Sequence, residues 1–164
     1  MLLIVGLGNP GQKYENTRHN VGARVINELE PLNLKNVVLV KPATFMNESG
    51  RAVKALVKSY KLKAESLIVI HDDIDLSLGK IKVSFGSGSA GHKGVQSIID
   101  SLGAKDFTRV RIGICPEAGK TKEVDKFVLQ KFSKDEEETL KETIQTAIKK
   151  IEEIVKPFDT AQDK

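Results

Sequence analysis

The strongest constraint on the fold is an alternation between short apolar runs and segments with helical spacing. Residues 2–5, 37–40 and 67–70 are runs of four aliphatic residues, the length typical of buried strands. Between them, apolar residues recur every three or four positions, which predicts amphipathic helices. Strands that alternate with helices form an α/β domain, and crossovers of this length favour parallel pairing. We therefore expect a twisted, mostly parallel but mixed sheet flanked by helices.

The remaining elements follow from spacing and from capping residues. Ser133 and Glu136 form a capping box before a long amphipathic helix, and Pro157 is expected to end that helix. Thr17 is a plausible N-cap for the first helix. The length of 164 residues predicts one domain over residues 1–156, followed by a frayed polar tail over residues 157–164. Other strands are expected at 80–85 and 109–114, and other helices at 52–60 and 95–102.

Bulk composition excludes several classes of protein. Apolar residues make up 40% of the chain, but no apolar run approaches the ~20 residues of a membrane span. The N-terminus lacks the basic region of a secretory signal, and Cys115 is the single cysteine, so we expect a cytoplasmic protein without disulfides or a thiolate zinc site. The net charge of +4 permits a polyanionic partner without requiring one.

The first strand runs into a glycine-rich turn that matches a dinucleotide fingerprint. Gly6, Gly8 and Gly11 have the G-x-G-x-x-G spacing. A dinucleotide site also needs a helix that begins at the third glycine and an acidic residue at the end of the next strand. Pro10 precedes Gly11, the helix begins only near residue 17, and the acidic residues lie in that helix. We therefore expect no nucleotide cofactor, and instead expect the turn to display Asn9 at the end of a strand.

A histidine and an aspartate follow strand ends or turns in a pattern that suits acid–base chemistry. His19 lies in the predicted first turn of a helix, where the helix dipole would keep it neutral and able to accept a proton. Asp72 follows an apolar strand, and a carboxylate there can orient an imidazole. No serine has the spacing of a nucleophile elbow, so water is the expected nucleophile if these residues catalyse.

Three aspartates close together also raise the question of a metal. Asp72 and Asp73 point to opposite faces if the strand continues, and no histidine pair or glutamate completes a ligand set with Asp75. We therefore expect no metal site.

Five segments together resemble bacterial peptidyl-tRNA hydrolases, in the same order. They are "GLGNPGQKYENTRHNVG", "KPATFMNESG", "HDDIDLSLGKIKV", "GSAGHKG" and "FTRVRIGI", and the resemblance covers most of residues 3–114. It implies a single α/β domain, usually monomeric, that needs no cofactor. It also implies cleavage of the ester between a peptide and the 3′ ribose of tRNA, with peptidyl-tRNA as partner and substrate.

The resemblance assigns roles to particular residues. His19 would activate water, Asp72 would orient His19, and Asn9 would help to place the ester. The expected peptide-binding residues are Tyr14, Phe45, Met46, Asn47, His92 and Lys93. The residues expected to meet tRNA phosphates are Lys82, Arg109 and Arg111, because alternate residues of a strand share a face and would form exposed basic rows.

Two departures from the family pattern leave a rival interpretation open. The segment Pro31–Val40 is shorter than usual, and Lys93 stands where an asparagine is typical. Lys93 either faces the site, where its charge would lower the pKa of His19, or extends outward to a tRNA phosphate, which is the arrangement we favour. The rival is a non-catalytic RNA-binding relative; the match at the catalytic positions favours the enzyme. A nucleotide-cofactor enzyme has little support.

Overall fold

The computed structural model describes residues 1–160, which contain one five-stranded sheet. The strand order is β2-β1-β3-β5-β4. The pairs β1–β2, β1–β3 and β3–β5 are parallel, and β4 is antiparallel to β5. This confirms the predicted mixed, mostly parallel sheet. The strands are β1 (Leu2–Gly6), β2 (Val37–Val40), β3 (Leu67–Ser77), β4 (Ile81–Phe85) and β5 (Thr108–Cys115).

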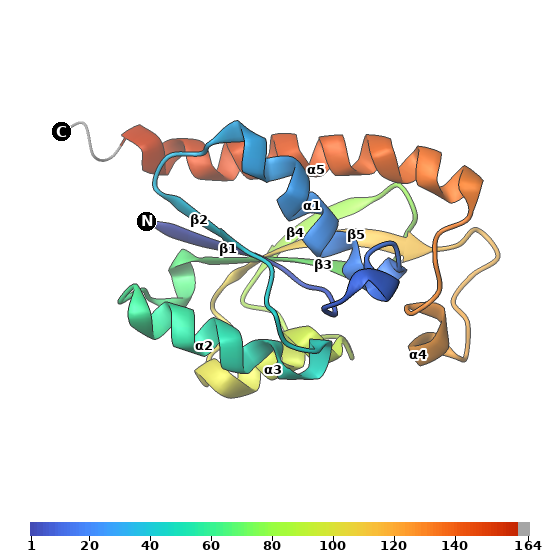
Figure 1. The fold of residues 1–164 in the computed structure, drawn as a ribbon, viewed down its shortest axis with the longest axis horizontal. Coiled ribbons are helices and arrows are strands. Elements are labelled where there is room, and N and C mark those ends of the chain that lie inside the picture. The colour runs from blue at the N-terminus through green and yellow to red at the C-terminus, as the bar shows by residue number, and fades with distance from the viewer. Residues whose placement is uncertain (161–164) are drawn as a thin grey trace.

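Helices cover both faces of the sheet, as Figure 1 shows. The helices are α1 (Val21–Leu29), α2 (Ser49–Ser59), α3 (Lys93–Leu102), α4 (Val124–Phe127) and α5 (Lys134–Thr160). Successive residues of β1 point to opposite faces: Leu2 and Ile4 pack with α1 and α5, whereas Leu3 and Val5 pack with α2 and α3. Each face therefore has its own apolar core, and the fully aliphatic β1 lies between them.

Strand β3 is longer than its apolar run. It continues past Ile70 to Ser77, with an irregularity in its pairing to β5 after Asp73. Asp72 and Asp73 therefore lie inside a strand and project from opposite faces, as expected if the strand continued. Their side chains meet different partners at the carboxyl end of the parallel sheet, the end at which open α/β sheets place their sites.

Helix α5 begins as the sequence predicts but does not end there. The Ser133 backbone N–H donates to Glu136 at 2.8 Å, and the Glu136 N–H donates to the Ser133 hydroxyl at 3.2 Å, which confirms the capping box. The predicted stop at Pro157 is wrong, because the helix continues through it to Thr160. Proline removes one backbone donor, but Ile151 and Val155 hold the preceding turn in the core. Of the predicted tail, residues 161–164 lie outside the described part of the chain.

The connection from α1 to β2 is short, and it leaves β2 as an edge strand. A turn at Glu30–Leu32 leads to Asn33 and Asn36, which both adopt left-handed backbone conformations (φ 48° and 57°) that asparagine tolerates. Over residues 1–160, no helix is both long enough and apolar enough to span a bilayer.

Candidate active site

Asp72, which lies inside β3, forms a buried pair with His19. His19 lies in a short 3-10 turn (Arg18–Asn20) just before α1, and its backbone N–H donates to the carbonyl of Val128 at 2.8 Å. Its Nδ1 lies 3.0 and 2.9 Å from the two carboxylate oxygens of Asp72. Since a carboxylate accepts, Nδ1 carries the proton and Nε2 is the nitrogen left to accept one. The pair has the tautomer that a general base requires.

A second histidine contacts the same carboxylate. His92 is the N-cap of α3, and its Nδ1 accepts the backbone N–H groups of Gly94 and Val95 at 3.1 and 3.2 Å. Its proton is therefore on Nε2, which donates to Asp72 Oδ1 at 2.9 Å. The helix cap thus sets the tautomer of His92, and His92 in turn holds Asp72.

The charge balance of the pair differs from the sequence-based expectation. Burial lowers the pKa of His19, but the charge and hydrogen bond of Asp72 outweigh burial, so the pKa lies above its ordinary value. The helix end was expected to lower the pKa of His19, whereas the Asp72 carboxylate at hydrogen-bond distance shifts it upward. Burial would raise the pKa of Asp72, but the two histidines hold it well below its usual range.

The three side chains also bring together atoms that could ligate a cation. One ligand atom from each of His19, Asp72 and His92 lies within 4.8 Å of the others. The histidine nitrogens next to Asp72 carry the protons that donate to it, and His92 cannot move its proton to Nδ1 without losing the bonds from Gly94 and Val95. The donor set fits proton chemistry better than metal binding.

These side chains line a cavity of about 250 Å³. Lys93 lies at this cavity with its ammonium 3.3 Å from Asp125, and its side chain is 63% exposed. Its charge lowers the pKa of His19, although less than Asp72 raises it. Lys93 therefore acts on His19 as in the inward arrangement, although its side chain is largely exposed and its ammonium pairs with Asp125 at the same cavity. Its contact with a tRNA phosphate stays a prediction. The other lining residues are His71, Asp73, Ile74, Ser89, Ala90, Gly91, Lys120, Val124, Asp125 and Val128.

Asn9 connects the glycine-rich turn to a different part of the chain. Its backbone N–H and C=O both bond to the Asn20 side chain at 2.9 Å, and its Oδ1 accepts the Met46 N–H at 2.7 Å. Among residues 1–160, no group accepts a hydrogen bond from its Nδ2. The turn therefore holds Asn9 in place and leaves its Nδ2 available as a hydrogen-bond donor.

The other predicted peptide-binding residues gather around Met46. Tyr14 and Phe45 meet edge to face, with ring centroids 6.4 Å apart, and Phe45 is 53% exposed. Asn47 is exposed beside the buried Met46. None of Asn9, Tyr14, Phe45, Met46 and Asn47 lines the cavity at His19.

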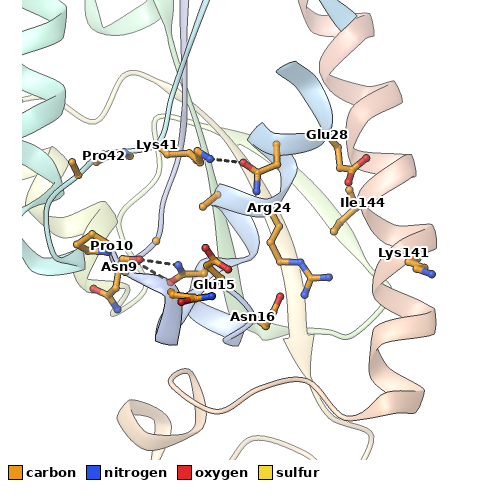
Figure 2. Close-up of a pocket in the computed structure, with 18 of the residues that line it drawn as sticks. Asn9, Pro10, Glu15, Asn16, Arg24, Glu28, Lys41, Pro42, Lys141 and Ile144 are labelled. Atoms are coloured by element: carbon orange, nitrogen blue, oxygen red, sulfur yellow. Dashed lines mark hydrogen bonds between the residues drawn. The ribbon is translucent and has the colours of Figure 1, made fainter. Parts of the chain in front are cut away.

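The glycine-rich turn also lines a larger pocket of about 820 Å³. Figure 2 shows Asn9, Pro10 and Pro42 on one side of this pocket and Lys141 and Ile144 of α5 on the other. Gly6, Gly8 and Gly11 all lie on its wall, but Gln12–Tyr14 follows as a 3-10 turn rather than a helix pointing at a phosphate. The structure therefore supports the rejection of a dinucleotide site.

Gly94 joins the His92 side of the site to the Met46 side. A Cβ atom built on Gly94 would lie 2.4 Å from Met46 Sδ and 3.1 Å from His92 Cε1. We expect Gly94→Ala to lower the free energy of unfolding by about 1–3 kcal/mol, the usual cost of overpacking, and to displace Met46. Chemical denaturation measures the loss. Gly88→Ala is the matched control, since a Cβ there meets no atom within 4 Å; equal stability of both variants would contradict this packing.

The predicted basic row is only partly exposed. Arg109 is 3% exposed, so its predicted place on an exposed face is wrong. Its guanidinium instead donates hydrogen bonds to Ser87 and Gly88 in the loop after β4. Arg111 donates from Nε to Asp73 at 2.6 Å and keeps 14% of its side chain exposed, whereas Lys82, opposite Arg111 on β4, is exposed.

A family model described as peptidyl-tRNA hydrolase matches residues 3–34 and 30–164. The chain belongs to the peptidyl-tRNA hydrolase family. The peptidyl-tRNA hydrolase of Thermodesulfovibrio yellowstonii is 46% identical over 177 residues, covering 94% of this chain and 92% of that protein. That of Aquifex aeolicus is 44% identical, covering 90% and 86%. The crystal structure of the Acinetobacter baumannii enzyme superposes with a TM-score of 0.87 at 33% identity, covering 96% of this chain and 89% of that one.

The comparison also locates the short segment. The two parts of the family match overlap at residues 30–34, between α1 and β2. The alignment with the Thermodesulfovibrio yellowstonii protein spans 177 positions, which is more than the 164 residues of this chain. The peptidyl-tRNA hydrolase relatives therefore carry residues that this chain lacks, in agreement with the short Pro31–Val40 segment.

Arg18 is a buried residue of the site that sequence reasoning missed. It is 7% exposed, bonds to Glu136 at 2.8 Å and lies over the Phe127 ring at 3.9 Å. These contacts tie the His19 turn to α4 and to the first turn of α5. No local signal predicts them, because the partners are more than one hundred residues away in the chain.

Proposed function

We propose that this chain hydrolyses the ester between the peptide and the tRNA 3′ ribose in peptidyl-tRNA, and so recycles the tRNA. The observation that carries the proposal is the His19–Asp72 pair beside a cavity, in which Nδ1 is bonded to the carboxylate and Nε2 has no partner among residues 1–160. Family membership supplies the substrate class. The net charge of +4 suits a polyanionic partner, and we propose that the protein acts as a monomer in the cytoplasm.

The reaction needs one base and neutral hydrogen-bond donors. His19 Nε2 takes a proton from water, whose oxygen attacks the ester carbonyl carbon. Asp72 stabilises the imidazolium that forms. The bond from carbon to the ribose 3′ oxygen then breaks, and the imidazolium returns its proton to that oxygen. The products are a peptide carboxylic acid, which ionises, and tRNA with a free 3′ hydroxyl.

Asn9 is suited to hold the peptide end of the substrate. Its Oδ1 accepts the Met46 N–H, so the amide is oriented and its Nδ2 is left without an acceptor among residues 1–160. An uncharged donor matches a peptide carbonyl oxygen. We place the exposed Asn47 beside it, with Tyr14, Phe45 and Met46 forming the apolar side of the peptide path.

Release of tRNA from an N-acetylated aminoacyl-tRNA tests the proposal. The enzyme releases free tRNA and the N-acetyl amino acid over many turnovers. The non-catalytic RNA-binding alternative predicts binding of the same molecule without release, and a gel shift with an uncleavable amide-linked analogue measures that binding separately.

We propose that Lys82 contacts a tRNA phosphate, with Arg111 near it across the strand pair. Lys82 is exposed and faces Arg111 in the β4–β5 register. Each lost phosphate contact reduces the slope of log K against log salt by about 0.7–0.9. We therefore expect Lys82→Ala to flatten the slope for tRNA binding by about that amount. Lys54→Ala, which removes an exposed lysine from α2, serves as control; identical slopes in the two variants would place the tRNA elsewhere.

A further inference from the structure

Arg109 is a buried cation that the reaction above does not use. It lies on β5 and is 3% exposed. Its Nη2 donates to the Ser87 hydroxyl at 2.5 Å and to the Gly88 carbonyl at 2.7 Å, and its Nη1 lies 3.4 Å from His71 Nε2. Over residues 1–160, no carboxylate forms an ion pair with it. Burial of an unpaired charge is costly, so these hydrogen bonds must compensate for lost water.

The loop that Arg109 holds forms the rim of the catalytic cavity. Residues 86–91 connect β4 to α3, and Ser89, Ala90 and Gly91 line the cavity together with His19 and Asp72. Ala90 has φ 50°, a left-handed conformation that costs a non-glycine residue about 1–2 kcal/mol. A loop with such a residue needs contacts that hold its shape, and the fork of Arg109 supplies two of them.

The same guanidinium contacts His71, which packs against His92. His71 is 2% exposed, and its Nδ1 donates to the Asp72 carbonyl at 2.7 Å, so its Nε2 is the acceptor that faces Arg109. The His71 ring meets the His92 ring edge to face, with centroids 4.7 Å apart. Arg109 is therefore linked to the loop of residues 86–91 by Nη2 and to His71, which contacts His92, by Nη1.

We propose that Arg109 is a positioning residue, which fixes the loop of residues 86–91 over the His19–Asp72 pair and so sets where the ester lies relative to His19. This inference rests on the proposed function, since it assigns a role within that reaction. It replaces a phosphate contact for Arg109, because a guanidinium that is 3% exposed and bonded to Ser87 and Gly88 cannot also meet tRNA at the surface.

The experiment compares Arg109→Lys and Ser87→Ala with Arg51→Met, which removes an exposed arginine from α2. Lysine keeps the charge but loses the fork. Ser87→Ala removes one loop bond and leaves the fold's charges unchanged. For each variant we measure kcat, KM, the salt slope of tRNA binding and the amide hydrogen exchange of residues 86–91 in the free protein.

We expect Arg109→Lys to lower kcat by about 10- to 100-fold, the range for a misplaced reacting group, with an unchanged salt slope. Exchange at residues 86–91 becomes faster, and Ser87→Ala moves kcat and exchange in the same direction by less. An unchanged kcat with a flatter salt slope would instead make Arg109 a phosphate contact. Wild-type kcat and exchange in both variants would also overturn the proposal.

Two features keep the result decisive. Should Arg109→Lys fail to fold, Ser87→Ala alone decides, because it removes one loop bond and keeps the Arg109 guanidinium with its bond to the Gly88 carbonyl. Should the wild-type protein cleave no ester, hydrogen exchange still reports whether Arg109 holds the loop, so failure of the proposed function and failure of this inference remain distinguishable.

Discussion

Replacing His19 with alanine is expected to lower the rate of ester cleavage by about 10²–10⁴, the usual contribution of a positioned general base. The physical reason is that Nε2 is the nitrogen left to accept a proton once Nδ1 donates to Asp72. Binding of tRNA should change little, because the side chain is only 11% exposed. Single-turnover cleavage and a binding assay with an uncleavable analogue measure the two effects separately.

His19→Gln is the matched variant for this experiment. A glutamine amide can donate to Asp72, yet it cannot take a proton near neutral pH. Both variants should therefore lose the same large factor while remaining folded by circular dichroism. Cleavage within a few-fold of wild type in either one would remove His19 from the mechanism.

Asp72→Asn is expected to lower kcat by about 10³–10⁴ while sparing substrate affinity. The carboxylate accepts from both His19 and His92, and an amide in its place opposes at least one of these N–H groups with another donor. His19 would then turn or change tautomer, and its imidazolium would lose the stabilising charge.

The pH dependence of Asp72→Asn gives a second readout. His19 acts when neutral, so the rate rises with pH through its pKa, which Asp72 holds above the ordinary value. Without the carboxylate, burial and the charge of Lys93 both lower that pKa, so the acidic limb should move to lower pH although the plateau falls. A limb that stays in place would show that Asp72 does not set the charge of His19, and loss of folding would make its role structural.

Those parts of the fold that depend on local pattern were predictable from sequence. The aliphatic runs at β1 and β3 have no polar residue that would face water, and both strands lie in the interior of the sheet. The run at β2 has the same pattern but lies at the edge of the sheet and is half-buried. The capping box of α5 needs only Ser133 and Glu136, three residues apart. His19 and Asp72 follow turns or apolar strands, and strands of a parallel sheet end at one edge, so their meeting was foreseeable.

Features that depend on distant partners were not predictable in this way. Arginines at alternate positions of a strand give the same sequence pattern whether their side chains face water or lie under a loop. Only the fold brings Ser87 and Gly88 to Arg109. His92 has a double role because its ring caps α3 and also reaches Asp72. Pro157 remains inside α5 because core packing of that helix overrides a local breaker.

The most direct test of the central claim is the rate at which the wild-type protein releases tRNA from N-acetylated aminoacyl-tRNA, measured from pH 5 to pH 8. We expect saturable, repeated turnover with a single acidic limb whose apparent pKa lies above 6.5, the ordinary value for a histidine. Binding of the substrate without release, or a rate that does not change across this range, would contradict that claim.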